Sequence, residues 1–160
     1  MAEEARTMFA GDAISSSLAR AFITVRGNRY LLFQGKKLDA TYTKDKKQLG
    51  ILGRTTKGNR AVGGKGAGKL TIYKNTDLFT RMIVEYQNTG KDTYFDMQIE
   101  NEDPTSNAGS RTVILKDCNI DSASIAAFDV DGDWLEEEID FTFEKVLLVK
   151  EFDMLDGMMA

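Results

Sequence analysis

The sequence contains no histidine, and among its 160 residues it has a single cysteine and a single proline. The lack of histidine excludes imidazole as a general base, the Ser-His-Asp triad and every histidine-ligated metal site. The one cysteine, Cys118, excludes an internal disulfide, and its apolar, alternating surroundings favour a buried side chain over a nucleophile. We therefore predict a protein that is not an enzyme, with no catalytic residues, no cofactor and no metal.

Long hydrophobic runs are also missing. Wholly apolar stretches are only a few residues long, as at residues 146–149, whereas a membrane-spanning helix needs about 20 apolar residues. The N-terminus carries early acids and no apolar core, which argues against a secretory signal. We predict one domain over residues 1–160, with a weakly patterned N-terminal arm (1–19) and a Met-rich C-terminal tail (154–160).

What the sequence does have is a sharp division of charge. Residues 26–69 contain twelve Lys and Arg and two acids, whereas residues 70–160 contain twenty acids and seven Lys and Arg. The net charge of −4 therefore hides a local balance of +10 followed by one of −13. Such a chain can place the basic surface of one subunit against the acidic surface of another, and head-to-tail contacts of this kind produce rings or filaments. A nucleic-acid site on the basic half is the alternative.

Hydrophobic alternation with a period of two predicts most of the fold. It places strands at residues 21–25, 29–33, 37–43, 70–73, 93–100, 112–115, 124–128 and 135–149. Gly27 and Asn28 form a hairpin signal between the first two strands. The last strand is the longest, and unbroken it would span about 50 Å at roughly 3.3 Å per residue.

One helix is predicted, beginning near Asn75 or Thr76, either of which can cap it, and ending by Gly90. Its apolar residues form one stripe: Leu78, Phe79, Met82, Ile83 and Tyr86. A single stripe indicates a helix that packs on a sheet. The predicted fold class is therefore mainly β, a β-sandwich or barrel with one packed α-helix.

Residues 54–69 are rich in glycine and basic residues and poor in apolar side chains, which predicts an extended, exposed hairpin loop. Within it, residues 63–69 match the pattern G-x-x-x-x-G-K of a phosphate-binding loop. However, Leu70 stands where that motif needs Ser or Thr for magnesium, and no buried strand precedes the glycines. We therefore interpret the lysines as a contact surface.

A second motif, at residues 129–133, resembles the start of a calcium loop. An EF-hand needs glycine at its sixth position and glutamate at its twelfth, whereas here glycine is fourth and the twelfth residue is Asp140. A tight turn leading into the final strand is the favoured interpretation.

The order and spacing of several blocks of residues carry a resemblance to a known family. The blocks lie at residues 53–58, 68–74, 94–95, 113–117, 121–126, 129–131 and 135–144, with Tyr86 in the predicted helix. Over residues 23–152 the chain is similar to the tail-tube proteins of contractile (myovirus-type) phage tails, PBSX-like prophage particles and phage-tail-like bacteriocins. The resemblance is weakest in the N-terminal arm and in the C-terminal tail.

The resemblance implies a subunit that assembles into hexameric rings, whose inner sheets join into one β-barrel and whose rings stack into a tube. It implies several partners: a contractile sheath, baseplate and tail-terminator proteins, and a tape-measure protein or DNA in the lumen without sequence-specific binding. It also implies a virion or tail-like particle, made in the bacterial cytoplasm and released by lysis. A ring-forming tube protein of a bacterial contractile secretion system has the same architecture and stays as an alternative.

The charge division supplies candidate contact residues for such an assembly. The predicted inter-subunit contacts pair a basic with an acidic set: Arg54, Lys57, Arg60, Lys65 and Lys69 against Glu136, Glu137, Glu138, Asp140 and Glu144. An alternative acidic surface comprises Asp129, Asp131 and Asp133. Two polar strand faces are candidates for the lumen: Asp39, Thr41, Thr43 and Asp45, or Asp96, Gln98 and Glu100. A nucleic-acid-binding β module on residues 26–69 is the remaining alternative, weakened by the scarcity of aromatic residues for base stacking.

Overall fold

The structure, a computed structural model, describes residues 7–159. Its elements are the 3₁₀ helix η1 (Ala10–Asp12), the strands β1 (Ala19–Val25), β2 (Asn28–Leu31), β3 (Gly35–Leu49) and β4 (Gly58–Tyr73), the helix α1 (Leu78–Thr89), and the strands β5 (Phe95–Glu102), β6 (Ser110–Ala123), β7 (Glu136–Phe143) and β8 (Lys145–Lys150). The predicted fold class, mainly β with one packed helix, is confirmed. No helix within residues 7–159 has the length and apolarity needed to cross a membrane.

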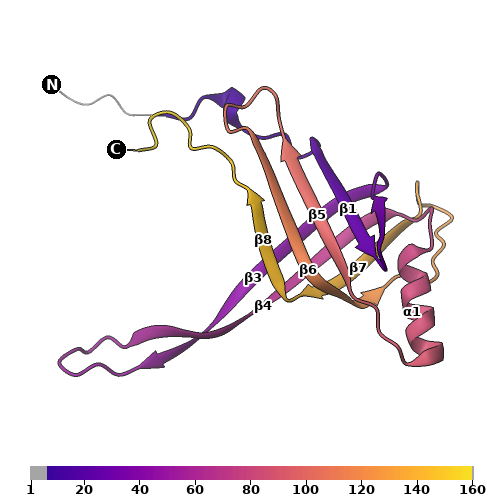
Figure 1. Ribbon diagram of the computed structural model, residues 1–160, viewed down its shortest axis with the longest axis horizontal. Helices are drawn as coiled ribbons and strands as arrows, with labels where there is room; N and C mark the ends of the chain where they lie inside the picture. Colours follow the sequence, from indigo (N-terminus) through magenta and orange to yellow (C-terminus); the bar gives the residue numbers. More distant parts are fainter. Residues whose placement is uncertain (1–6, 160) are drawn as a thin grey trace.

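All strand pairs are antiparallel, and the strands follow the order β2-β1-β5-β6-β7-β4-β3, with β8 also paired to β6. The sheet folds into two layers that cross each other (Figure 1). The first layer contains β2, β1, β5, the beginning of β6 and β8, and the second contains the end of β6, β7, β4 and β3. Strand β6 therefore belongs to both layers.

The passage of β6 between the layers is made at Asp117. This residue has a positive φ of 54°, a conformation that aspartate tolerates better than most residues. Its backbone N–H donates to Oδ1 of Asp96 at 3.2 Å, and the register of β5 against β6 shifts at the same place. Before this bend β6 pairs with β5 and β8, and from Asn119 onward it pairs with β7.

The core lies between the two layers and under α1. A chain of aromatic rings crosses it: the centroids of Phe79 and Phe95 are 6.2 Å apart, those of Phe95 and Phe141 6.5 Å, and those of Phe141 and Phe143 6.4 Å. These rings connect α1, β5 and β7, which are far apart in sequence. The predicted stripe of α1 faces this core through the buried Phe79 and Met82, whereas Tyr86 is exposed.

The turn between β1 and β2 occurs where the sequence predicts it, with positive φ at Arg26 (51°) and Gly27 (79°). Helix α1 also ends as predicted, at Gly90, which is left-handed (φ 73°). The start of α1 differs from the prediction. Its N-cap is Asp77 rather than Asn75 or Thr76, and the Asp77 side chain makes no capping hydrogen bond.

Two predicted strands are wrong. Residues 124–128 form no strand and belong to an irregular segment, residues 124–135, which we call the β6–β7 loop. The long strand predicted at residues 135–149 is two strands, because the chain bends at Glu144 and passes from the second layer to the first. The backbone N–H of Glu144 donates to the carbonyl of Lys116 at 3.1 Å. Apolar alternation continues across the bend, so the pattern alone did not reveal it.

The predicted loop at residues 54–69 is an extended strand from Gly58 onward, since β4 begins there and pairs with β3 as far as Ile72. Packing explains the glycines at two positions of β4. A Cβ atom on Gly66 would lie 2.3 Å from the ring of Phe143, and one on Gly68 would lie 2.5 Å from the ring of Phe141. The aromatic side chains of β7 cross the backbone of β4 at these points, so only glycine fits.

The two ends of the described chain lie side by side, at one corner of the first layer (Figure 1). Both contact the loop between β5 and β6. The carboxylate of Asp103 accepts the backbone N–H of Ser15 at 2.9 Å and that of Thr105 at 3.0 Å, and these bonds hold the pKa of Asp103 below its usual value. The backbone N–H of Asp153 donates to the carbonyl of Ala108 at 2.7 Å.

Candidate assembly surfaces

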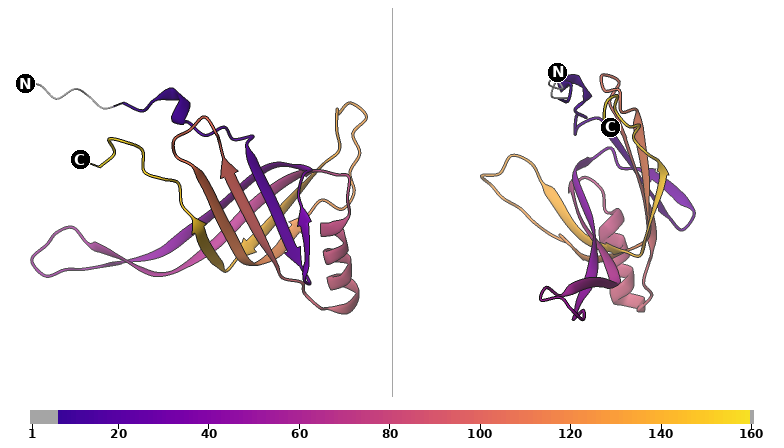
Figure 2. Two further views of the ribbon diagram at one scale, coloured as in Figure 1. Left: turned by 45° about the horizontal axis from the view of Figure 1, so that its top comes forward. Right: turned by 90° about the vertical axis from the view of Figure 1, so that its left-hand side faces the viewer.

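The most prominent surface is the outer part of the β3–β4 hairpin, residues 43–65, which we call the distal hairpin. Strands β4 and β7 pair only from Gly66 to Tyr73, so beyond Gly66 the hairpin continues as a two-stranded ribbon. It projects away from both layers (Figures 1 and 2). Every residue in it is exposed except the half-buried Gly58. It carries seven Lys and Arg and one acid, so its net charge is +6.

Four of the five predicted basic contact residues belong to the distal hairpin. Arg54 and Lys57 lie in its turn, whereas Arg60 and Lys65 lie on β4, and all four are exposed. The fifth, Lys69, lies in the body of the sheet, and its Nζ is 3.7 Å from a carboxylate oxygen of Glu138 in the same chain. The sequence therefore located the basic projection but extended it too far toward the body.

The five predicted acidic contact residues do not form one surface. Glu144 and Glu138 are exposed, Asp140 is half-buried, and Glu136 forms an ion pair with Lys36. Glu137 is fully buried, because its side chain points to the core side of β7 between the layers. Glu137 thus lies inside the subunit, and the period-two alternation could have indicated this, since Glu137 has the same parity as Ile139.

Glu137 forms a buried ion pair with Lys74. The Nζ of Lys74 is 3.2 Å from Oε2 of Glu137, 3.5 Å from the Asp77 carboxylate and 2.8 Å from the hydroxyl of Thr80, while Oε1 of Glu137 has no hydrogen-bond partner within the described residues. Burial raises the pKa of Glu137, and the hydrogen bond from Lys74 partly opposes this shift. The pair joins the start of β7 to the segment that leads into α1.

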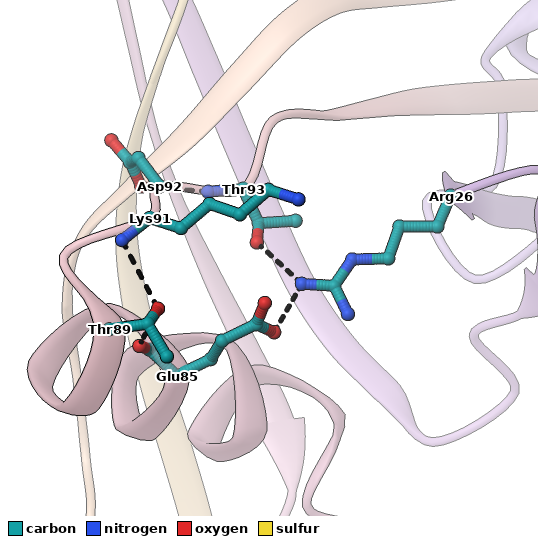
Figure 3. Close-up of polar contacts among 6 residues, drawn as sticks. All are labelled: Arg26, Glu85, Thr89, Lys91, Asp92 and Thr93. Atoms are coloured by element: carbon teal, nitrogen blue, oxygen red, sulfur yellow. Dashed lines mark hydrogen bonds and ion pairs between the residues drawn. The ribbon is translucent and has the colours of Figure 1, made fainter.

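A second polar cluster fixes the other end of α1 (Figure 3). The guanidinium of Arg26, in the β1–β2 turn, donates to the carboxylate of Glu85 on α1 and, at 3.1 Å, to the hydroxyl of Thr93. The hydrogen bond from Arg26 lowers the pKa of Glu85. This cluster ties the helix to β1 and to the start of β5, which is a structural role.

The outward face of the second layer is polar across all four strands. The alternation that buries Leu70, Ile139 and Phe141 turns the intervening residues away from the core. The outward residues are Lys37, Asp39 and Thr41 on β3, Ala67, Lys69 and Thr71 on β4, Glu138, Asp140 and Thr142 on β7, and Asn119 and Ser122 on β6. All are exposed or half-buried, and acids and bases are mixed among them.

The β6–β7 loop is the most exposed apolar segment of the body. Phe128 is 92% exposed, Val130 91% and Trp134 73%. Asp129, Asp131 and Asp133 alternate with these residues and are also exposed. In the ribbon views the loop projects from the body at the end of the second layer away from the distal hairpin (Figure 2).

The residues that resembled chemical motifs do not form chemical sites. Residues 63–69 lie on β4 and open no helix, so they lack the geometry of a phosphate-binding loop. Within residues 7–159 no group of three or more His, Cys, Asp or Glu side chains could hold a metal ion. Cys118 is fully buried, and burial raises the pKa of its thiol to about 12, so the thiol is unreactive at neutral pH.

Comparison with known proteins agrees with a subunit built for assembly. Residues 6–156 match the model of a family described as phage tail tube protein. The chain belongs to the phage tail tube protein family. It is also 41% identical over 109 residues to the phage-like element PBSX protein XkdM of Bacillus subtilis (strain 168), which covers 68% of this chain and 74% of the relative.

Solved structures share the fold of this tail tube protein. The sheath–tube complex of the PVC extracellular contractile injection system contains a chain with a TM-score of 0.64 and 13% identity, covering 84% of this chain and 90% of that one. The SPP1 tail tube gives a TM-score of 0.63 and 15% identity over 88% of this chain and 81% of that one. These structures confirm the expected fold, and the family match confirms the expectation of a tail tube subunit.

Proposed function

We propose that this tail tube protein forms hexameric rings that stack into the inner tube of a contractile phage tail or tail-like particle, with the second layer lining the channel. The proposal depends chiefly on one observation: the second layer combines a polar outward face with two open edges. Within residues 7–159, no strand pairs with the outer edge of β3, and none pairs with the second side of Asn119–Ala123 in β6.

Open edges are hazardous in a monomer because they invite pairing with other chains. A ring removes this hazard when β3 of one subunit pairs with the end of β6 in the next, so that the second layers of all subunits form one closed barrel. In that arrangement the face with Asp39 and Thr41 lines the lumen, whereas Thr43 and Asp45 of the same predicted face belong to the distal hairpin. The alternative lining, Asp96, Gln98 and Glu100, belongs to β5 in the first layer and is placed outside the barrel.

The lumen so formed has mixed charge. Lys69 lies near Glu138, and Lys37 and Asp39 lie on the same face, so acids and bases largely offset each other. Such a surface attracts a polyanion only weakly, which suits the passage of DNA or of a tape-measure protein without sequence-specific binding. The outer surface of the tube meets the sheath, and the tube ends meet baseplate and terminator proteins.

The distal hairpin provides the contact between rings. Its basic residues Arg54, Lys57, Arg60 and Lys65 dock on an acidic surface of an adjacent subunit, with each exposed pair adding only about 0–1 kcal/mol. Because the contact is repeated by every subunit of a ring, a weak contact is sufficient to hold two rings together.

The subunit performs no chemistry. It is synthesised in the bacterial cytoplasm, incorporated into a particle and released by lysis.

Electron microscopy of the purified protein at rising concentration, and of particles from producing cells, tests this proposal. We expect rings and hollow tubes of uniform width. A variant with Lys57→Glu, Arg60→Glu and Lys65→Glu should keep its circular dichroism spectrum and fail to form tubes, whereas the control Lys91→Glu, at the end of α1, should form them. A protein that stays monomeric and is absent from every particle would contradict the proposal, and steeply salt-dependent DNA binding by that monomer would favour a nucleic-acid module instead.

A further inference from the structure

The distal hairpin and the β6–β7 loop lie at opposite ends of the second layer. Along β4 and β7 the pairing begins with Gly66 opposite Phe143, next to the distal hairpin, and finishes with Tyr73 opposite Glu136, next to the β6–β7 loop. Figure 1 shows the two segments at opposite ends of the molecule. A contact between them in one chain is therefore ruled out by the fold, whereas a head-to-tail contact between two copies is possible.

A cleft lies at the base of the β6–β7 loop. Its volume is about 220 Å³, and it is lined by Lys74, Ser124, Ile125, Ala126, Ala127, Leu135 and Glu136. Most of these residues are apolar, and Ile125 and Leu135 are half exposed in the free subunit. A cavity of about 150 Å³ is enough to hold benzene, so this cleft has room for one aliphatic side chain.

The turn of the distal hairpin carries a side chain of that kind. Leu52 is fully exposed, and the turn is fixed by the positive φ of Gly53 (82°) and by a hydrogen bond from the N–H of Arg54 to the carbonyl of Ile51 at 3.1 Å. Arg54 and Lys57 follow Leu52 in the same turn. The turn thus presents the exposed apolar side chain of Leu52 together with the cations of Arg54 and Lys57.

The β6–β7 loop has the complementary combination. Three exposed carboxylates alternate there with exposed apolar residues, and the loop is held by its own turn, in which Asp129 accepts the N–H of Asp131 at 3.0 Å. Exposed aromatic residues rimmed by charge are typical of a surface that a partner covers. The negative charge of this loop is complementary to the positive charge of the distal hairpin, and it would repel an acidic partner.

We propose that the tip of the distal hairpin of one copy docks head-to-tail on the β6–β7 loop of a second copy. Leu52 enters the cleft lined by Ile125 and Leu135, and the cations of Arg54 and Lys57 lie beside the carboxylates of Asp129, Asp131 and Asp133. A contact between two different patches repeats from subunit to subunit and gives either a closed ring or an open stack, and the open stack corresponds to the stacking of rings. Complementary charge sets the register of the contact. Leu52 and the aromatic residues Phe128 and Trp134 supply most of its binding free energy. This inference rests on the proposed tube function and assigns the partner of its docking element.

The single tryptophan of the chain, Trp134, lies in the proposed contact and gives a direct measurement. In tubes polymerised from the purified protein alone, we expect its fluorescence to shift to shorter wavelength and its quenching by acrylamide to fall several-fold relative to the monomer. A Trp134→Phe variant, which contains no tryptophan, gives the background fluorescence. Tubes in which Trp134 keeps the emission and quenching of the monomer would overturn the docking site while leaving the tube function intact.

Complementary charge reversal identifies the partner surface. A variant with Asp129→Lys, Asp131→Lys and Asp133→Lys should not polymerise, and neither should one with Arg54→Glu and Lys57→Glu, whereas one chain carrying both sets should recover tubes. Polymerisation of the triple variant at the wild-type concentration would refute the contact. Protection of Trp134 only after a sheath protein is added would also refute it, because the loop would then bind the sheath.

The apolar part of the contact has its own control within the distal hairpin. Leu52→Ser should raise the critical concentration for tube formation roughly tenfold. Val62→Ser removes a side chain that is 58% exposed in the same hairpin but away from the tip, and we expect less than a twofold change. Equal effects of the two substitutions would contradict the seating of Leu52 in the cleft.

Discussion

Strands β3 and β4 pass through both the body of the second layer and the distal hairpin, and they stay paired throughout, yet the two regions differ in burial and in the number of neighbouring strands. In the body, Leu70 is 2% exposed and Ile72 is fully buried, and β7 pairs with β4 on one side while β3 pairs with it on the other. In the distal hairpin no third strand is present and almost every side chain is exposed. An isolated two-stranded hairpin is marginally stable in water.

The comparison separates the residues that stabilise the fold from those that are available for assembly. Residues of the body are set by packing within the subunit, whereas residues 43–65 gain almost nothing from the core of their own chain. A ribbon that carries a net charge of +6 repels itself and becomes favourable when an acidic surface covers it. Each prediction below separates the two regions, since a change in the body should alter folding and a change in the hairpin should alter assembly.

Removal of the distal hairpin should have the largest effect. In the shortened variant, an Asn-Gly turn replaces residues 45–63, and the paired residues Lys44 and Gly64 flank the new turn. We expect loss of tube formation at any concentration, because the docking element is gone, with a melting temperature near that of the wild type. Electron microscopy and thermal unfolding measure the two properties. Tubes from this variant would show that the hairpin is dispensable, and an unfolded protein would show that it supports the body.

Removal of one partner of the buried ion pair should give the largest loss of stability in the body. Lys74→Met leaves the carboxylate of Glu137 buried without its cation, which costs about 3–5 kcal/mol of unfolding free energy at neutral pH. The pKa of Glu137 is raised in the folded protein, so the folded state binds its proton more tightly than the unfolded state does. Stability linked to this proton is therefore present at acid pH and is lost as the pH rises through the folded pKa.

Urea unfolding of Lys74→Met as a function of pH tests this linkage. The loss of unfolding free energy relative to the wild type should become smaller as the pH falls and Glu137 becomes neutral. The double variant Lys74→Met, Glu137→Leu is the control, since it removes both charges and should recover most of the loss. A deficit of the same size at every pH would mean that packing of the lysine stem, rather than charge, is lost.

Two glycines of β4 give a matched pair across the boundary between the two regions. Gly68→Val places a side chain against the Phe141 ring, where even a Cβ would lie at 2.5 Å, and we expect a loss of about 1–3 kcal/mol from overpacking. Gly63→Val lies in the distal hairpin, where the nearest atom is 4.0 Å from a Cβ, and should leave the unfolding free energy unchanged. A similar cost at both positions would show that the backbone of β4, rather than contact with the aromatic ring, requires glycine, since valine has the higher strand propensity.

Much of the fold could be predicted from sequence because alternation and turn signals were clear. The β1–β2 turn and the end of α1 at Gly90 were predicted and lie where expected. The error at residues 135–149 has a clear physical cause. A bend such as that at Glu144 keeps the alternation intact while moving the strand to another layer, so no local pattern marks it.

The assembly surfaces were predictable only in part. Charge located the basic projection, but the same composition could not separate Arg54, which is exposed at the tip, from Lys69, which lies near Glu138 within the subunit. The glycines at positions 66 and 68 suggested an exposed loop, whereas they make room for rings from β7, a contact between residues more than 70 positions apart in the chain. Long-range packing of this kind leaves no mark in a local window of sequence.

The smallest expected effect concerns Lys69, which lies on the body side of the boundary. Its ion pair with Glu138 has side chains that are 55% and 62% exposed, and pairs of this kind contribute about 0–1 kcal/mol. Lys69→Ala should therefore change the unfolding free energy by less than about 1 kcal/mol and leave tube formation at its wild-type concentration. The matched variant Lys57→Ala should leave stability unchanged and raise the critical concentration, because its charge faces another subunit. If Lys69→Ala hindered assembly as strongly as Lys57→Ala, the docking surface would have to extend along β4 into the body, and the boundary between folding and assembly residues would move from Lys65 to the neighbourhood of β7.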